Sequence, residues 1–315
     1  MRQYGSGRPL VVVAFGGNAL LQAQDDGSFS QQLKRAEVAA KAIHNLVRRG
    51  FRVLCVHGNG PQVGQELIRS EEASTKLPIA PLDACVASTQ GTMGYLLELA
   101  LYNQSHALRI GTVLTLVEVD AEDPLFRKPT KPVGPFFPAH RANELKRKQK
   151  WQMVDDAGRG WRKVVASPLP IGIVNVEAID AMVSRMDVVI AGGGGGIPVV
   201  RTPGGKTAGV EAVIDKDRTA ALLGQVLGAA ALLIVTAVER VSLDFGKPTE
   251  RQLTHMTVEE AEQHLADGQF PPGSMGPKVQ AALQFTRSTH HPAVIGTVAQ
   301  LGRMASGRGG TRLIA

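Results

Sequence analysis

Short apolar runs alternate with longer helical patterns along most of this chain. Strand-like runs lie at 10–15, 51–57, 112–119, 188–191, 231–235 and 293–296. Helical patterns lie at 31–49, 82–104 and 278–287, and another follows Asp217. Strands that alternate with helices form parallel sheets covered on both faces. The pattern therefore predicts an α/β fold with a mainly parallel sheet.

Residues at the segment ends support these helices. Gly50 follows the first helical pattern, where glycine commonly stops a helix. Pro61 suits the first turn of a helix, because the N–H that proline lacks has no partner there. Thr257 with Glu260 three residues later is a capping-box pattern, which predicts a helix through Leu265.

The alternation breaks from about Asp120 to Pro168. Residues 127–135 contain too many prolines for a helix or an inner strand. A basic helical pattern follows, and then a glycine-containing turn at 155–160 lies between two strand-like pieces. We expect one domain spanning residues 1–315 with an inserted subdomain at 120–168. Prolines stiffen the arm around Lys131 and nearby glycines allow bending, so we expect this subdomain to be a mobile lid.

Three glycine-rich stretches each follow a strand-like run, at 15–19, 57–64 and 191–198. Glycines after a strand leave backbone N–H groups open to an anion, because no Cβ stands in the way. Three such stretches indicate one anion-holding crevice at the carboxyl edge of the sheet, although each alone could be a tight turn. The amides of Asn18 and Asn59 can donate and accept, which suits a small planar substrate. His57 is more typical of a packed structural histidine than of a base.

Two nucleotide-binding motifs nearly match and fail. Residues 204–207 end like a phosphate-binding P-loop, but Val200 stands where the motif needs its upstream glycine. In the 58–64 stretch the last glycine comes one place too late for the dinucleotide fingerprint.

Lysines beside helix starts are the second unusual feature. Asp215 and Asp217 flank Lys216 at a predicted helix start, where carboxylates can simply cap the helix or can fix neighbouring lysines. Lys278 follows a rigid loop at another helix start, where a cation opposes the helix dipole unless an anion binds. With Lys131 on its proline arm, these lysines favour phosphoryl transfer, which needs positive charge and no protein nucleophile.

The amino-acid composition narrows the classes of protein to which this chain can belong. The 315 residues are 43% hydrophobic and 20% charged, as in a folded soluble domain. Aromatic residues make up only 4%, so base-stacking surfaces for nucleic acid are not expected despite the net charge of +7. The two cysteines suit neither a disulfide framework nor a zinc site. We see no signal-peptide pattern or membrane span and expect a cytoplasmic protein.

Taken in order, these segments resemble carbamate kinases, a group within the amino acid kinase superfamily. The resemblance covers almost the whole chain. Its most specific parts are 57–64, 128–135, 192–198, 209–217 and 270–278. Lys131 and the subdomain around it separate carbamate kinases from other members of the superfamily.

The resemblance implies a three-layer αβα sandwich around a mainly parallel eight-stranded sheet, in a homodimer. It implies reversible phosphoryl transfer between carbamoyl phosphate plus MgADP and carbamate plus MgATP. The direction expected is ATP synthesis during breakdown of arginine or another carbamoyl-yielding nitrogen compound. The Mg²⁺ would be held mainly by the nucleotide phosphates, without a protein metal site.

The resemblance also implies roles for individual residues. The catalytic residues would be Lys131, Lys216, Asp217 and Lys278. The carbamate or carbamoyl phosphate would be held by Gly16, Gly17, Asn18, Gly58, Asn59 and Gly60. The nucleotide would contact Lys216, Thr236, Val238, Met275, Gly276 and Lys278. The segment 240–248 lacks the tyrosine expected beside the adenine, and we expect Leu243 to fill that space.

Two other functions stay open at this level. The chain could be a kinase of another small acid on the same fold, against which Lys131 on its proline arm argues. It could also be a non-catalytic nucleotide or metabolite sensor, although every expected lysine and Asp217 are present.

Overall fold

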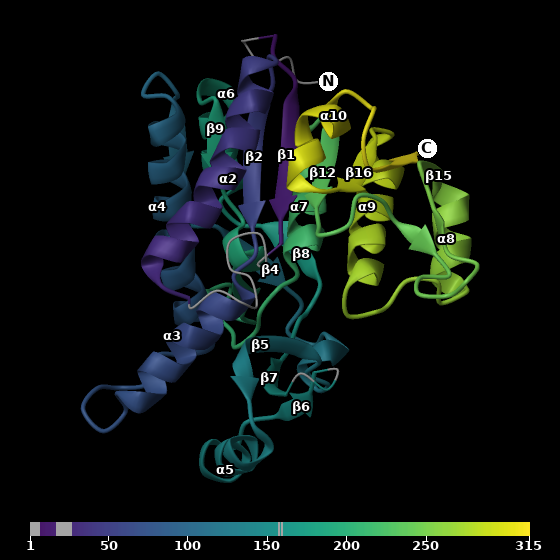
Figure 1. Cartoon of the computed structure of the whole chain (residues 1–315). Coiled ribbons are helices and arrows are strands. Elements are labelled where there is room, and N and C mark those ends of the chain that lie inside the picture. The colour runs from purple at the N-terminus through teal and green to yellow at the C-terminus, as the bar shows by residue number, and fades with distance from the viewer. Residues whose placement is uncertain (1–6, 17–26, 157, 159) are drawn as a thin grey trace.

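An eight-stranded, mainly parallel sheet forms the centre of the molecule (Figure 1). The computed structural model describes residues 7–16, 27–156, 158 and 160–315. In sheet order the strands are β15 (His255–Thr257), β17 (Thr311–Ile314), β16 (Ala293–Gly296), β12 (Ala231–Val235), β1 (Leu10–Phe15), β2 (Arg52–His57), β9 (Val188–Ile190) and β3 (Ile110–Thr112). Only the β16–β17 pair is antiparallel in this sheet. The predicted fold class is confirmed.

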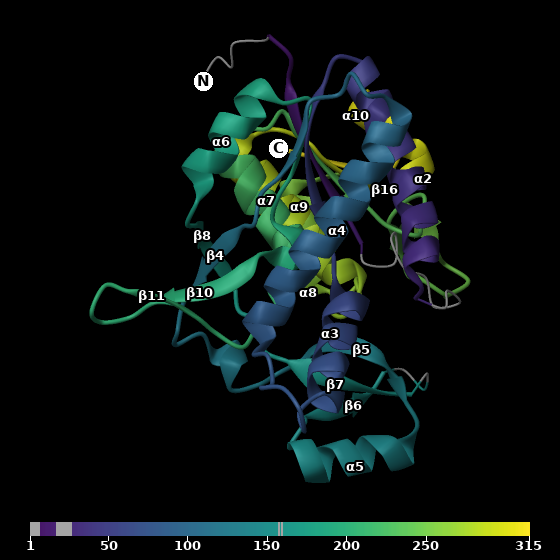
Figure 2. The ribbon, with the colours of Figure 1, turned by 90° about the vertical axis from the view of Figure 1, so that its left-hand side faces the viewer.

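Helices cover both faces of this sheet. Along β1, Leu10, Val12 and Ala14 enter one apolar core, whereas the alternate residues enter the other. The first core is covered by α6 (Val176–Arg185), α7 (Lys216–Val226), α8 (Val258–Ala266) and α9 (Met275–Thr289). The second is covered by α2 (Phe29–Arg48), α4 (Leu82–Gln104) and α10 (Leu301–Ala305). Figure 2 shows α6 and α7 on one side of the strands and α2 and α10 on the other.

The helix ends follow the local sequence closely. Ser28 caps α2 by accepting a hydrogen bond from the Gln31 N–H, so this helix begins two residues earlier than expected. Thr257 and Glu260 form the predicted capping box at the start of α8. Pro61 lies in the first turn of α3 (Gly60–Glu72), as predicted.

The prediction of one strand at 112–119 is wrong. The apolar run is divided between β3 in the main sheet and β4 (Leu116–Val119) in a second sheet. The order of that four-stranded sheet is β11 (Thr207–Gly209), β10 (Ile197–Arg201), β4 and β8 (Pro170–Ile173). The chain leaves the main sheet at Thr115, whose N–H donates to Gln90 Oε1 over 2.9 Å. A side chain from α4 therefore takes the place of a strand partner at this point.

The apparent P-loop ending at 204–207 belongs to a β-hairpin turn. The Thr202 N–H donates to the Lys206 carbonyl between β10 and β11, and Gly205 has a φ of 76°. Gly204, Gly205 and Lys206 are all exposed. The prediction that this segment is not a phosphate-binding P-loop is consistent with the structure.

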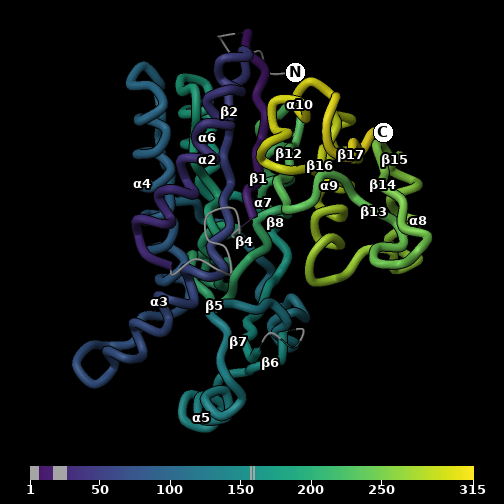
Figure 3. Tube along the Cα trace, in the orientation of Figure 1, coloured from purple at the N-terminus to yellow at the C-terminus, as the bar shows by residue number. Residues whose placement is uncertain are grey.

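The inserted segment builds its own small layer beyond the carboxyl ends of the main strands. Its sheet has the order β5 (Lys131–Phe137), β7 (Trp161–Val165) and β6 (Met153–Asp155), with α5 (Ala139–Gln149) beside it and the turn η1 (Pro124–Phe126) before it. A separate apolar cluster forms from Ala142, Leu145, Trp151 and Met153. Figure 3 shows these elements together at the lower end of the molecule. Because β5 is an edge strand, it tolerates Pro132 and Pro135. The mobility of this layer stays a prediction.

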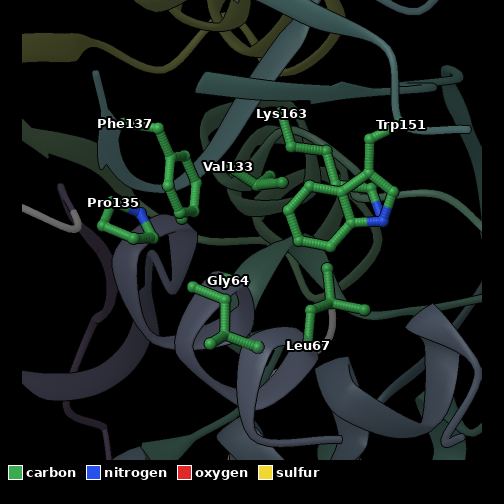
Figure 4. A pocket seen from close by; sticks show the side chains of 9 residues that line it. Gly64, Leu67, Val133, Pro135, Phe137, Trp151 and Lys163 are labelled. Atoms are coloured by element: carbon green, nitrogen blue, oxygen red, sulfur yellow. The ribbon is translucent and has the colours of Figure 1, made fainter. Parts of the chain in front are cut away.

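Helix α3 carries the subdomain through an unusually close contact. A Cβ atom at Gly64 would overlap the backbone of Gly134 in β5, so helix and strand touch backbone to backbone. Beside this contact lies a small pocket between α3 and the subdomain, lined among others by Leu67, Val133 and Trp151. Figure 4 shows Leu67 on the α3 side of it and Phe137 and Trp151 on the other.

Four short elements complete the described chain. They are η2 (Gly193–Gly195), η3 (Val298–Gln300) and the pair β13 (Ser242–Leu243) with β14 (Arg251–Gln252). Cys55 and Cys85 are buried free thiols, as expected. Across the residues that the structure describes, no helix is long and apolar enough to cross a membrane.

Candidate active site

The carboxyl ends of β1, β2, β9 and β12 meet at one edge of the sheet, facing the inserted subdomain (Figure 1). Gly16 directly follows β1, and the Gly58 N–H donates to the Phe15 carbonyl over 2.9 Å. Asn59 and Gly60 begin α3 at the same edge. The structure therefore brings Gly16, Gly58, Asn59 and Gly60 together. Gly17 and Asn18 lie outside the described residues.

The glycine run 192–196 is the hub of this edge. A Cβ atom would overlap His57 if placed at Gly193, the Asn59 amide if placed at Gly194, and the Ile214 carbonyl if placed at Gly195. Gly194 and Gly195 also have φ values of 67° and 92°, which side chains rarely allow. Glycine is needed here because three other segments pack directly on the backbone.

This hub departs from the expected role of the third glycine stretch. The N–H of Gly192 donates to Thr115 Oγ1, and those of Gly195 and Gly196 donate to carbonyls of the same run. These three N–H groups are therefore not open to an anion. In this stretch glycine serves close packing more than anion binding.

His57 is a packed histidine, as the sequence favoured. It is only 1% exposed, and its Nδ1 lies 3.2 Å from the Gly58 carbonyl, to which it donates. Burial lowers the pKa of His57 to about 4, with the Gly58 hydrogen bond opposing that shift. The ring is therefore neutral near pH 7.

A buried carboxylate joins two of the candidate lysines. Asp217 Oδ2 accepts hydrogen bonds from Lys216 Nζ and from Lys278 Nζ, each over 2.9 Å. Asp217 is 1% exposed, and its Oδ1 has no hydrogen-bond partner among the described residues. One carboxylate thus fixes a lysine of α7 and a lysine of α9 side by side.

Capping and lysine binding are divided between the two aspartates. Asp215 caps α7, because its Oδ1 accepts from the Asp217 N–H over 2.9 Å and from the Arg218 N–H over 3.4 Å. Its Oδ2 lies 3.3 Å from Lys131 Nζ. The capping interpretation thus fits Asp215, whereas the Asp217 side chain binds the two lysines.

Lys131 links the inserted subdomain to the hub. Its Nζ donates to the Ile214 carbonyl over 2.9 Å, and Ile214 packs against Gly195. Lys131 belongs to β5, so its reach depends on where the subdomain sits. The hub therefore connects the Asn59 end of the crevice to the lysine end.

Burial and charge act against each other in this cluster. Burial lowers the pKa of Lys216, helped by the nearby charge of Lys278 and opposed by Asp217. Burial also acts to lower the pKa of Lys278, but the charge and hydrogen bond of Asp217 outweigh it and raise that pKa. Burial would raise the pKa of Asp215, yet the charges of Lys131, Lys216 and Lys278 hold it well below its usual range. Three lysines against two aspartates leave one excess positive charge for an anion.

The candidate nucleotide residues lie around the adjoining edge of the sheet. The Thr236 N–H, just after β12, donates to the Gly296 carbonyl over 2.8 Å, and Val238 is half-buried in the following loop. Met275 and Gly276 form the first turn of α9, which begins three residues earlier than expected and includes Lys278 in that turn. Leu243 is buried in the core.

Sequence reasoning missed three polar residues that hold the crevice together. Thr89 and Gln90 are both 2% exposed on α4, and Thr115 is fully buried. Gln90 Nε2 donates to the Gly193 carbonyl over 2.9 Å, while Asn59 Nδ2 donates to Thr89 Oγ1 over 2.8 Å. The polar run Ser88-Thr89-Gln90 in the middle of this helical pattern was the available signal.

The model of the amino acid kinase family matches residues 9–297 of this chain. The chain belongs to the amino acid kinase family. Within that family, the carbamate kinase-like protein YahI of Escherichia coli is 43% identical over 313 residues, which are 98% of this chain and 99% of that protein. Carbamate kinase 1 of Enterococcus faecium is 44% identical over 301 residues, covering 94% and 95% of the two chains.

Solved structures of carbamate kinase share the fold of this chain. Carbamate kinase from Giardia lamblia bound to citric acid superposes with a TM-score of 0.92 at 37% identity, covering 98% of each chain. The same enzyme bound to AMP-PNP gives a TM-score of 0.89 at 38% identity, also covering 98% of each chain. The resemblance to carbamate kinases seen in the sequence is confirmed.

Proposed function

We propose that this chain catalyses reversible phosphoryl transfer between carbamoyl phosphate plus MgADP and carbamate plus MgATP. The observation that carries the proposal is Asp217, one buried carboxylate that fixes Lys216 and Lys278 beside the carboxyl ends of the strands. Full-length similarity to carbamate kinases supports the same reaction. We propose that the direction is ATP synthesis during breakdown of carbamoyl-yielding nitrogen compounds.

The proposed mechanism needs positioning and positive charge, and no covalent intermediate on the protein. Lys216 and Lys278 would stabilise the negative charge on the transferring phosphoryl group. Asp217 would hold both ammonium groups in place, so that no reorganisation is needed during transfer. Lys131 would contact the same group from the subdomain, exchanging Asp215 for the substrate anion.

The acyl end of the substrate would lie at the other end of the crevice. Gly16, Gly58, Asn59 and Gly60 lie there, and the expected roles of Gly17 and Asn18 are part of the same proposal. Thr236, Val238, Met275 and Gly276 would line the nucleotide side. The glycine hub between the two ends fixes their separation.

We propose that Mg²⁺ arrives with the nucleotide. The lysine-rich cluster repels a free dication, and each of its two aspartates already binds a lysine, so the residues present fit an ion carried by phosphate oxygens. When bound, the ion neutralises phosphate charge.

A coupled assay for ATP formed from carbamoyl phosphate and MgADP tests the function. We expect ATP formation that depends on both substrates. A folded protein that binds ADP without forming ATP would instead favour a nucleotide sensor. ATP formed from another acyl phosphate, and not from carbamoyl phosphate, would favour a kinase of a different small acid.

We also propose a homodimer and a cytoplasmic location, both of which stay predictions. Light scattering of the purified protein during size-exclusion chromatography measures the first. Cell fractionation measures the second.

A further inference from the structure

The side chain of Asn59 is held by a residue outside the glycine motifs. Asn59 is 2% exposed, and its amide packs against Gly194 of the hub. Its Nδ2 lies 2.8 Å from Oγ1 of Thr89 on α4. Thr89 is also 2% exposed, so water does not compete strongly for this contact.

The hydrogen bonds of Thr89 determine which way the Asn59 amide faces. A threonine hydroxyl has one hydrogen to donate, and Thr89 Oγ1 donates it to the Val86 carbonyl over 2.7 Å. Towards Asn59 the hydroxyl can therefore only accept. The NH₂ group of Asn59 must face Thr89, and its Oδ1 must face away from Thr89.

The Oδ1 atom of Asn59 accepts no capping hydrogen bond, although Asn59 lies at the start of a helix. Asn59 is the N-cap residue of α3, where an asparagine oxygen commonly accepts from the first turn of the helix. Here the side chain makes no capping hydrogen bond. Among the described residues no donor to Asn59 Oδ1 is found either. Asn59 Oδ1 is not one of the buried side-chain atoms that lack a partner, so it stays accessible, and a bound ligand with an N–H group can donate to it.

We propose that Thr89 fixes the Asn59 amide so that Oδ1 accepts a hydrogen bond from the amino group of the carbamoyl substrate. The inference rests on the proposed function and adds a positioning residue that determines specificity. A carbamoyl group differs from an acetyl group by having NH₂ where acetyl has CH₃. Only the carbamoyl group can donate to Oδ1, so the fixed amide favours carbamoyl over acyl phosphates.

The test compares Thr89→Val with Thr89→Ser. Valine keeps the shape and removes the acceptor for Asn59 Nδ2, whereas serine keeps the hydroxyl. Two quantities are measured for each protein: kcat/KM for carbamoyl phosphate with saturating MgADP, and the inhibition constant of acetyl phosphate as a competitor. We expect Thr89→Val to lower kcat/KM about tenfold or more while the acetyl phosphate constant stays within about twofold. Thr89→Ser is expected to keep both values near those of the wild type.

Other outcomes overturn the inference. If Thr89→Val weakens carbamoyl and acetyl phosphate equally, Thr89 is only structural. If neither value changes, the amide is not fixed by Thr89. If Thr89→Val does not fold, Thr89→Ala removes the same acceptor and carries the same expectation.

The wild-type protein separates this inference from the proposed function. Failure to form ATP from carbamoyl phosphate contradicts the function itself. Normal ATP formation, together with acetyl phosphate binding as tightly as carbamoyl phosphate, contradicts only the role of Thr89.

Discussion

At the scale of single residues, chemistry in this crevice depends on how charged groups are held. Asp217 has one oxygen shared by two lysines, and Asp215 combines a helix cap with a contact to Lys131. Buried ammonium groups held in this way need little reorganisation when a phosphoryl group arrives. The consequences can be measured one side chain at a time.

Lys278→Ala is expected to lower turnover by about two orders of magnitude or more, because a preorganised charge at the transition state contributes about 3–4 kcal/mol. The fold is expected to persist, which circular dichroism would check. Steady-state kinetics at saturating substrates give the turnover. Wild-type turnover in the folded variant would remove Lys278 from the site.

Asp217→Asn is expected to damage kcat more than ADP binding, because the carboxylate orients lysines and does not itself contact ADP. Kinetics and calorimetric titration with ADP measure the two effects. Since Asp215 supplies the cap of α7, loss of a cap worth about 0.5–2 kcal/mol is not expected to explain the change. A variant that loses ADP binding yet keeps normal turnover at saturation would contradict the orienting role.

At the scale of elements, the contact between α3 and β5 sets where Lys131 can reach. Gly64 and Gly134 touch backbone to backbone, and Lys131 lies three residues before Gly134 on the same strand. Arg162 on β7 reinforces the position by donating to the Gly134 carbonyl over 3.0 Å. A displacement of β5 at this contact therefore moves the lysine.

Gly64→Ala tests this contact. Alanine favours the helix by about 1 kcal/mol over glycine, so any loss must come from the overlap with Gly134. We expect lower kcat and a destabilisation of about 1–3 kcal/mol from overpacking. Gly91→Ala in α4 is the matched control, because a Cβ placed there meets no atom of the described residues within 4 Å beyond its chain neighbours and the backbone of its own helix. If Gly64→Ala behaves like Gly91→Ala in melting and kinetics, the contact does not position Lys131.

At the scale of the whole molecule, the main body and the inserted layer hold different parts of the crevice. The main body carries Asp217 and its two lysines, whereas the layer carries Lys131. Closure of a lid excludes water, which would otherwise compete for the phosphoryl group. Closure of the predicted lid would therefore move Lys131 relative to Asp217 and its two lysines.

Hydrogen exchange in residues 120–168 is expected to slow when ADP and a carbamoyl phosphate analogue are bound together. Lys131→Ala is expected to impair transfer strongly while ADP affinity stays within a few-fold, since the nucleotide residues belong to the main body. Exchange mass spectrometry and ADP titration measure the two results. Unchanged exchange together with a fully active variant would make the segment a static insertion.

The sequence predicted the sheet, most helices and the candidate lysines because these depend on local patterns. It could not divide the run 112–119 into two strands, since the Thr115 N–H between them donates to Gln90, a residue of the preceding helix 25 positions away. It could not separate the roles of Asp215 and Asp217 either, because Lys278 reaches Asp217 from 61 residues away. Thr89 was missed for the same reason, as its partner Asn59 lies on another element.

The glycine hub also limits how this enzyme can change over evolutionary time. At Gly194 and Gly195 any side chain meets both a backbone conformation that resists it and a neighbour already in the space. Viable sequence drift at these positions is therefore close to zero, whatever the substrate. Under the proposed role of Asn59 and its partner Thr89, new acyl preferences would arise through these bordering residues and not through the hub. Descendants of this kind would keep the glycines of the hub while their substrate preference changes.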